Sequence, residues 1–383
     1  MRNIMSWIKT VSMQLIIGIF FLELFSFLGS KAGIFIVNYT PALYQFQSSS
    51  SISESYNEGR TEREVWGAWR RPNSTTRQGR ECFDIEISTN EVGARDSSFE
   101  QLEGKNLVLL GDSFAEGFGV EYTNTAQYIL EQKLGINVLN FGSAGNFGPL
   151  QQYLIYRDLA SSYEHDSVLI FVLPANDFTD NDRAYWEGSE ANRIRYRPYY
   201  SYQDNILTPW YFPEATATDI YGDYSVSTDS SNVTAINLTV RIKKFLIGNL
   251  WLSNPLRTLS YILTKHDITA GNYYLSATEE QQSDLVRAYS SVVVEAAGKP
   301  VSFVIIPTQR DFMLLENNVE LVESQVWHQG LKELASSSGG VFIDLINFRT
   351  RDTTKLFHTC DGHWSEFGNI WAAGAIVDEF SNH

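Results

Sequence analysis

Five short apolar runs constrain the fold of this chain more than any other feature of its sequence. Each run is apolar without alternation, and a segment with helical periodicity separates it from the next. Continuous apolar strands between helices are typical of a parallel sheet that helices cover on both faces. The sequence therefore predicts an α/β fold with about five parallel strands, namely NLVLLGD (106–112), INVLNFG (136–142), SVLIFVLPAND (167–177), VSFVIIPT (301–308) and VFIDL (341–345).

The apolar spacing between and after these runs predicts amphipathic helices. These helices are TAQYILEQKLG (125–135), PLQQYLIYRDLASSY (149–163), SDLVRAYSSVVVEAAG (283–298), LVESQVWHQGLKELASSSGG (321–340) and EFGNIWAAGAIVDEF (366–380). A long insertion at about 178–278 interrupts the alternation, first with a stretch rich in Tyr, Trp and Arg, then with a predicted helical hairpin or broken helix at 236–265. Insertions of this length usually form a lid or a substrate surface, and an ordinary subdomain is the alternative.

The N-terminus carries a nearly continuous apolar stretch, VSMQLIIGIFFLELFSFLG (11–29), which is interrupted by the single acid Glu23. About 20 such residues in a helix cross a bilayer. Arg2 and Lys9 precede the stretch, which predicts a signal anchor with residues 1–10 in the cytoplasm and the rest in the periplasm or another extracytoplasmic compartment. A cleaved signal peptide is the alternative.

Composition and residue usage indicate how the rest of the chain is organised. The formal net charge is −16, from 45 acids and 29 bases, which argues against general nucleic-acid binding. Residues 30–60 form a Ser-rich linker, 61–103 a small β-rich lead-in, and 104–383 the predicted catalytic domain. In an exported protein, Cys82 and Cys360 could form one disulfide, or they could be two unpaired core residues.

Ser113 is the candidate nucleophile, because it directly follows the first apolar strand in GDS (111–113). At the start of a helix its hydroxyl would be exposed beside unpaired backbone N–H groups, where the helix dipole favours an anion. The alternative interpretation is that Ser113, or its neighbour Asp112, simply caps the helix.

A nucleophilic serine needs a general base, and the chain offers few suitable histidines. His363 follows the fifth strand in DGHW (361–364), with Asp361 two residues before it. A carboxylate beside an imidazole fixes the tautomer of the ring and stabilises the imidazolium. We therefore expect His363 to be the base, with His358 the next candidate.

Acyl transfer also needs donors for the oxyanion. The second strand ends in NFGSAGNFG (140–148), which offers glycine N–H groups, and the third ends in ANDF (175–178), which offers the Asn176 amide. The glycines could instead serve only a tight turn.

The four blocks together resemble those of the SGNH (GDSL-type) hydrolase superfamily over about 104–380, apart from the insertion. The resemblance implies a flavodoxin-like α/β/α sandwich in which Ser113 is the nucleophile, His363 the base and Asp361 its partner. It also implies oxyanion donors on Ser113, Gly145 and Asn176. Two departures stand out, namely Pro174 in place of a glycine and one residue rather than two between the acid and the base. This shorter spacing resembles membrane-linked proteins of polysaccharide O-acetylation, and it leaves Asp352 as an alternative acid.

The predicted function is a membrane-anchored serine esterase that removes short acyl groups, such as O-acetyl, from a carbohydrate or cell-envelope substrate. The alternatives are an O-acyltransferase with the same triad, a lipase or lysophospholipase, and a non-catalytic binding protein. Asp112 and Trp364, which adjoin the predicted triad, are candidate substrate contacts. No cofactor or metal is expected, because the histidines are not clustered and the cysteines lie far apart.

Overall fold

The computed structural model of the chain contains two compact units, residues 1–47 with 227–270, and residues 48–226 with 271–383. The described residues are 2–32, 34, 65–67, 69–80, 82–100, 102–145, 147–187, 197–203, 206–211, 250–264, 273–315, 319–348, 350 and 353–382.

A five-stranded parallel sheet forms the centre of the larger unit, with strand order β4-β3-β5-β8-β9. The predicted α/β class and the count of parallel strands are thus confirmed. Every residue of β3 and β8 is buried, which explains why these strands are apolar apart from Asn106 and Ser302. The strands are β3 (Asn106–Leu110), β4 (Asn137–Asn140), β5 (Ser167–Val172), β8 (Val301–Ile305) and β9 (Phe342–Asp344).

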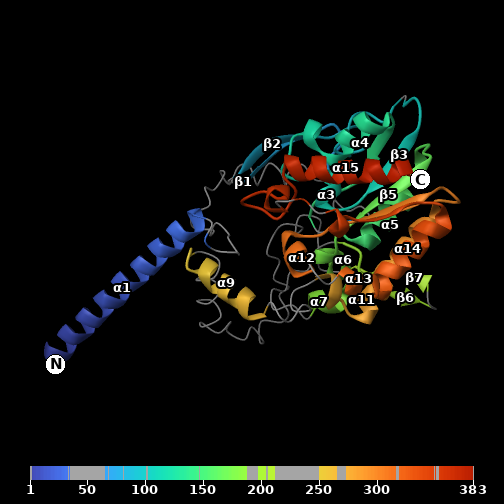
Figure 1. Ribbon diagram of the computed structural model, residues 1–383. Helices are drawn as coiled ribbons and strands as arrows, with labels where there is room; N and C mark the ends of the chain where they lie inside the picture. Colours follow the sequence, from blue (N-terminus) through green and yellow to red (C-terminus); the bar gives the residue numbers. More distant parts are fainter. Residues whose placement is uncertain are drawn as a thin grey trace. The chain divides into compact units, whose positions relative to one another are not determined.

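Helices cover the sheet in two groups. One group contains α4 and α15, which pack on each other, and the other contains α5, α11 and α14, in which α11 packs on both neighbours (Figure 1). The longer helices of this unit are α4 (Ala126–Leu134), α5 (Pro149–Asp158), α11 (Glu279–Glu295), α14 (Val326–Ser338) and α15 (Glu366–Asn382). The shorter ones are α3 (Ser113–Glu116), α6 (Pro174–Asp180), α7 (Arg183–Glu187), α10 (Tyr273–Ser276), α12 (Gln309–Leu314) and α13 (Val319–Glu323).

Local sequence signals explain most of these boundaries. The Thr125 hydroxyl accepts a hydrogen bond from the Tyr128 N–H at the start of α4, and Gly135 ends the helix in the left-handed region at φ +66°. The helix predicted over 321–340 is instead two helices, α13 and α14. The prediction was wrong here because Gln325 is extended, with ψ +141°, and breaks the helical backbone between them.

The lead-in contains an antiparallel hairpin of β1 (Thr75–Arg80) and β2 (Phe83–Ser88). Phe83, Ile85 and Ile87 point to its buried side, whereas the alternate residues of β2 are exposed. Within the insertion, the described part in this unit holds α7, α10 and a two-residue pairing of β6 (Tyr202–Gln203) with β7 (Ile206–Leu207). The predicted role of the insertion stays a prediction, since much of 188–272 lies outside the described residues, as does the linker beyond residue 34.

The smaller unit contains α1 (Arg2–Lys31) and α9 (Ser253–Thr264). The segment Thr10–Lys31 of α1 is 22 residues long with a mean hydropathy of 2.1, and 6% of its most apolar window is buried. By length and composition it could cross a bilayer, and a signal sequence has the same properties. Of the predicted helical hairpin at 236–265, α9 is the helix among the described residues.

Candidate active site

Ser113 begins α3 directly after β3, and Asp112 rather than Ser113 is the N-cap of this helix. The Asp112 carboxylate accepts a hydrogen bond from the Phe114 N–H at 2.9 Å. The Ser113 hydroxyl is therefore not used as a helix cap. Gly111 makes the turn possible, because a Cβ at this position would lie 2.7 Å from the Cβ of Ala115 and 2.9 Å from that of Phe171. The backbone of Gly111 is at φ +155°.

His363 links the predicted nucleophile to the predicted acid. Its Nε2 lies 2.7 Å from Ser113 Oγ, and its Nδ1 contacts Asp361 Oδ1. The same carboxylate oxygen accepts the His363 backbone N–H at 3.0 Å, which holds the acid and the ring in one turn. The His363 and Asp361 side chains are 24% and 16% exposed, so the pair is sheltered but open to solvent. The arrangement is that of a serine, a base and an orienting carboxylate.

The Asp361 carboxylate is kept ionised by its neighbours. Burial alone raises the pKa of Asp361, but the hydrogen bonds and charge of His363 and the guanidinium charge of Arg80 outweigh it, so the net pKa lies below its usual value. Arg80 Nε lies 3.8 Å from Asp361 Oδ2. A carboxylate that stays ionised can stabilise a positive charge on the neighbouring imidazole.

Asn176, at the start of α6 after β5, lies beside the nucleophile loop. Its Nδ2 donates to Asp112 Oδ2 at 3.3 Å, so the cap of α3 also orients this amide. Ser113 follows β3 and Asn176 follows β5, which are adjacent strands at the point where the strand order reverses. Open α/β sheets bind ligands at this position. The role of Asn176 as an oxyanion donor remains a prediction.

Two buried acids lie behind this edge of the sheet. Burial raises the pKa of Asp112, and hydrogen bonds from Phe114 and Asn176 and the charge of His363 only partly oppose it. Burial raises the pKa of Asp177 well above its usual value, and the charges of Asp112 and Asp180 add to the effect. Asp177 Oδ2 accepts the Leu173 N–H at 2.8 Å, which fixes the turn that carries Asn176.

The glycine loop after β4 approaches α3 closely. A Cβ on Gly142 would lie 2.5 Å from the Cβ of Ala115 and 2.7 Å from the backbone nitrogen of Glu116, so this position requires a glycine. The backbone of Gly145 is at φ +101°, a conformation that favours glycine. That the Gly145 N–H is an oxyanion donor remains a prediction.

Several residues that support the site were not predicted from the sequence. Arg95 donates to the carbonyls of Glu116, Gly117 and Val120, and so satisfies the C-terminal end of α3. Arg70 forms a buried ion pair with Glu116 in the same helix. Both arginines precede the sheet in loops without a periodic pattern, so only their position before the GDS block could have drawn attention to them.

The lead-in hairpin also supports the ring of the base. Phe118 stacks on His363 with ring centroids 4.3 Å apart, and Phe83 of β2 packs edge-on against Phe118 at 5.6 Å. The Gly119 N–H donates to Gln78 Oε1 of β1 at 2.8 Å. The hairpin thus fixes the loop that follows α3 and carries Phe118.

A disulfide joins Cys82, in the turn of the hairpin, to Cys360, which directly precedes Asp361. The Cys82 N–H also lies 3.2 Å from Cys360 Sγ. The loop that carries both Asp361 and His363 is thereby covalently tied to the hairpin.

The structure differs from two of the predicted substrate contacts. Asp112 and Trp364 are each 1% exposed, so neither side chain lines an open site. The Trp364 ring packs edge-on against Phe114 and Phe171 in the core. His358, the second candidate base, is held by its backbone N–H on the His363 carbonyl, and burial lowers its pKa. Asp352, the alternative acid, lies outside the described residues.

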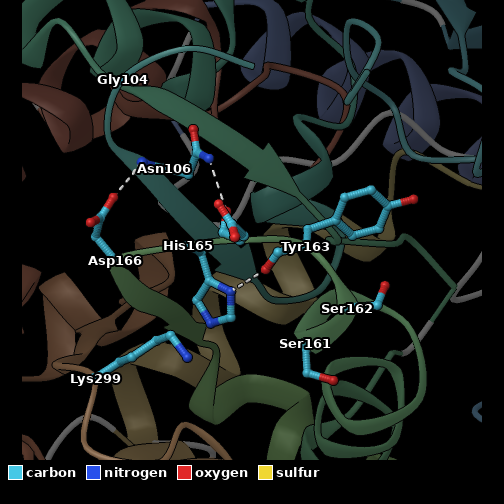
Figure 2. Close-up of a pocket in the computed structure, with 9 residues that line it drawn as sticks. Gly104, Asn106, Ser161, Ser162, Tyr163, His165, Asp166 and Lys299 are labelled. Atoms are coloured by element: carbon cyan, nitrogen blue, oxygen red, sulfur yellow. Dashed lines mark hydrogen bonds between the residues drawn. The ribbon is translucent and has the colours of Figure 1, made fainter. Parts of the chain in front are cut away.

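A pocket of about 410 Å³ lies at the opposite, amino-terminal edge of the sheet (Figure 2). Its lining includes Asn106 at the start of β3 and Lys299 just before β8. His165 in this pocket uses both ring nitrogens, Nδ1 with the Tyr163 carbonyl at 2.7 Å and Nε2 with the Tyr156 hydroxyl at 2.9 Å. Because both nitrogens are engaged within the protein, this histidine is structural, and the pocket does not belong to the triad.

Comparison with known proteins gives similarity to solved structures alone, since no model of a known family and no curated protein matches the chain. One similar structure is a member of the lipolytic protein G-D-S-L family from Veillonella parvula (13% identity, 73% of this chain and 100% of that one, TM-score 0.37). Another is the lipase/acylhydrolase from Enterococcus faecalis (11% identity, 73% of this chain and 96% of that one, TM-score 0.36). A third is an acetyl xylan esterase from Butyrivibrio proteoclasticus (9% identity, 73% of this chain and 64% of that one, TM-score 0.36). Identities and TM-scores this low assign no activity to this chain, so its function has to be argued from the site.

Proposed function

We propose that this protein is a serine ester hydrolase that works through an acyl-enzyme, with Ser113, His363 and Asp361 as its triad. The observation that carries the proposal is the 2.7 Å approach of His363 Nε2 to Ser113 Oγ, with Nδ1 of the same ring on Asp361. A nucleophile and a base in hydrogen-bond reach, with the base oriented by a third group, are the signature of nucleophilic catalysis. Asp112 takes over the helix cap and leaves the serine hydroxyl to the base.

The proposed reaction has two acyl-transfer steps. Ser113 Oγ attacks the ester carbonyl while its proton passes to His363 Nε2. The resulting oxyanion accepts hydrogen bonds from the Ser113 and Gly145 backbone N–H groups and from the Asn176 amide. The tetrahedral intermediate expels the alcohol, which takes the proton from His363. A water molecule then gives its proton to His363 and attacks the acyl-enzyme, and the carboxylic acid leaves as Ser113 regains its proton.

The proposed substrate is a short acyl ester, such as O-acetyl, on a carbohydrate or cell-envelope polymer. Two features of the sequence support this choice, namely the aromatic and Arg-rich first part of the insertion and the apolar N-terminal segment. The proposed location is a single-pass membrane protein, with α1 as its anchor and the catalytic unit outside the cytoplasm.

The experiment that tests the proposal uses the full chain in detergent with p-nitrophenyl acetate and a fluorophosphonate probe. The wild type should hydrolyse the ester and become covalently labelled, and Ser113→Ala should lose both properties. Ser97→Ala, in the exposed turn after Asn90, is the matched control and should keep both. Failure of the wild-type chain to label would favour a non-catalytic binding protein.

An O-acyltransferase is the second candidate, favoured by the single residue between Asp361 and His363. Such an enzyme would form the same acyl-enzyme and pass the acyl group to a sugar hydroxyl in place of water. The two functions are separated by adding an oligosaccharide to the esterase assay and measuring both products. More acetylated sugar than free acetate would establish transfer as the main reaction.

A further inference from the structure

Glu23 is the one acidic residue in the apolar segment Thr10–Lys31, and its carboxylate has specific partners. It accepts the backbone N–H of Trp251 at 2.7 Å and that of Leu252 at 3.0 Å. Both donors lie in the turn that leads into α9, more than 200 residues away in the chain. Ionisable residues within membrane helices are costly and usually have such partners.

The turn before α9 satisfies all of its backbone donors. The Ser253 N–H donates to the Leu250 carbonyl at 3.1 Å, and the Asn254 N–H donates to the Trp251 carbonyl at 3.0 Å. Pro255 has no N–H. With Glu23 accepting from residues 251 and 252, the stretch 251–255 leaves no backbone donor without a partner. This condition has to hold for backbone that enters a hydrocarbon layer without water.

Side-chain contacts hold the same turn against the C-terminal third of α1. The Trp251 ring packs edge-on against Phe27 at 5.3 Å, and Lys31 Nζ lies 5.5 Å from its centre. Asn254 Nδ2 donates to Ser30 Oγ at 2.9 Å, and both residues are buried. The polar groups of Asn254 and Ser30 thus face each other and not the surroundings.

On the side of α9 that points away from α1, the described side chains include two exposed leucines. Leu256 is 56% exposed and Leu259 is 52% exposed, whereas Asn254 and Thr258 are buried. On the face of α1 that points away from this contact, Phe25 and Leu28 are 60% and 55% exposed. The exposed leucines of α9 thus belong to a helix that is docked on an apolar segment long enough to cross a bilayer, and lipid is an environment that suits both.

We propose that residues 250–259 enter the bilayer leaflet at the C-terminal end of α1, where Glu23 docks them and where Leu256 and Leu259 contact acyl chains. Glu23 lies eight residues before Lys31, about 12 Å along a helix, which places it within a leaflet of roughly 15 Å. This inference rests on the proposed membrane anchoring, and it is independent of the proposed ester hydrolysis. The catalytic chain is then connected to the bilayer through its insertion as well as through its N-terminus.

The test uses the full chain with one added cysteine, which is selectively labelled because the two native cysteines form a disulfide. A nitroxide is attached in Leu256→Cys, Leu259→Cys or the control Val294→Cys, which replaces an apolar residue of α11 that is 76% exposed. The proteins are reconstituted in phosphatidylcholine vesicles with phosphatidylglycerol. Flotation reports anchoring, and collision rates with oxygen and with a water-soluble nickel chelate report lipid or water around each label.

At positions 256 and 259 we expect high oxygen and low nickel accessibility, and at position 294 the reverse. Glu23→Ala should float but shift the labels at 256 and 259 to the accessibility of position 294. Glu23→Gln, which keeps an acceptor oxygen, should shift them less. Phe21→Leu, on the other side of α1 and 61% exposed, should leave them unchanged.

The outcomes that overturn the inference differ from those that overturn its premise. A chain that does not float refutes the membrane anchoring, and the inference with it. A chain that floats with water-exposed labels at 256 and 259 refutes the leaflet position alone. Labels that stay in lipid in Glu23→Ala refute Glu23 as the docking residue. None of these results depends on esterase activity, which the same samples report separately.

Discussion

Two histidine–aspartate pairs lie among the described residues of the larger unit, and they differ in which ring nitrogen contacts the carboxylate. His363 contacts Asp361 through Nδ1 and leaves Nε2 facing Ser113 Oγ. His328 contacts Asp344 through Nε2, at 3.1 Å. An imidazole transfers a proton in catalysis when one nitrogen is oriented by the carboxylate and the other reaches the reacting group. The first pair meets this requirement.

The surroundings of the two pairs differ as well. The His328 and Asp344 side chains are 6% and 3% exposed, and Asp344 also accepts the Ile346 N–H at 3.1 Å. This pair ties α14 to the end of β9 inside the core. The Asp361–His363 pair lies within one turn of a partly exposed loop. The comparison teaches that a histidine beside an aspartate is not by itself a sign of catalysis. A neighbouring hydroxyl and access for substrate distinguish a candidate catalytic pair from a structural one.

The largest expected effect separates the two histidines. His363→Ala should lower kcat for p-nitrophenyl acetate by ~10⁴-fold or more while the protein stays folded. His328→Ala should keep kcat within a few-fold but lower the free energy of unfolding by about 1–3 kcal/mol, because it leaves a buried Asp344 oxygen without its partner. Steady-state kinetics and urea denaturation measure the two effects. Equal losses of kcat would mean that the comparison is wrong.

Substitution of Asp361 and of Asp344 should show the same contrast as the two histidines, with a smaller change in kcat. Asp361→Asn keeps the shape of the turn but removes the charge that stabilises the imidazolium, so kcat should fall by up to ~10⁴-fold with KM little changed. Asp344→Asn should leave kcat unaffected and destabilise the fold. If Asp361→Asn retained full activity, the acid would have to be sought elsewhere, with Asp352 as the first alternative.

A third prediction concerns the disulfide Cys82–Cys360, which adjoins the Asp361–His363 pair and not the His328–Asp344 pair. Cys82→Ser with Cys360→Ser frees the loop that carries Asp361 and His363, and kcat should fall by up to ~10²-fold, as expected for ångström-scale misplacement. Removing this long-range crosslink should also cost about 2–5 kcal/mol of unfolding free energy. Reductant should lower the wild-type kcat in the same way and have no effect on the double variant. Unchanged turnover in a folded double variant would contradict the positioning role.

The sequence predicted that Ser113 and Asn176 lie near each other because the sheet itself brings them together. The apolar strands end where Ser113 and Asn176 begin, and the carboxyl ends of parallel strands meet at one edge. The partner of His363 was predicted from the two-residue spacing, which allows a contact within one turn. These inferences needed only periodicity and spacing.

The supporting contacts could not be predicted in this way. Arg95 reaches the end of α3 from a loop, and Phe118 stacks on His363 because the lead-in hairpin folds beside it. Neither contact leaves a periodic pattern in the sequence. Trp364 was expected at the substrate, but the bridge between Phe357 and Trp364 turns its chain segment toward the core, where the ring is buried. Burial of this kind depends on tertiary packing, which motif spacing does not encode.

The smallest expected effect concerns the charge that Arg80 supplies to the exposed pair. Arg80→Gln removes a cation 3.8 Å from Asp361 Oδ2, so the pKa of Asp361 should rise toward its usual value. Arg80 is 55% exposed, so solvent screening limits the effect to less than about 1 kcal/mol. Carboxyl NMR titration of Asp361 measures the shift. Arg77→Gln, which breaks the ion pair with Asp84 on the same hairpin, is the matched control and should leave the pKa of Asp361 unchanged.

The same variant should alter the dependence of stability on pH. Because the folded pKa of Asp361 lies below its unfolded value, its contribution to stability is complete above the unfolded pKa of about 3.9 and is lost as pH falls through the folded pKa. Arg80→Gln brings the folded pKa of Asp361 closer to its unfolded pKa. The variant should therefore be less stable than the wild type at pH 7, and the two proteins should differ least at the lowest pH. A difference between the two proteins that grew as pH fell would mean that Arg80 stabilises the fold by some means other than its charge on Asp361.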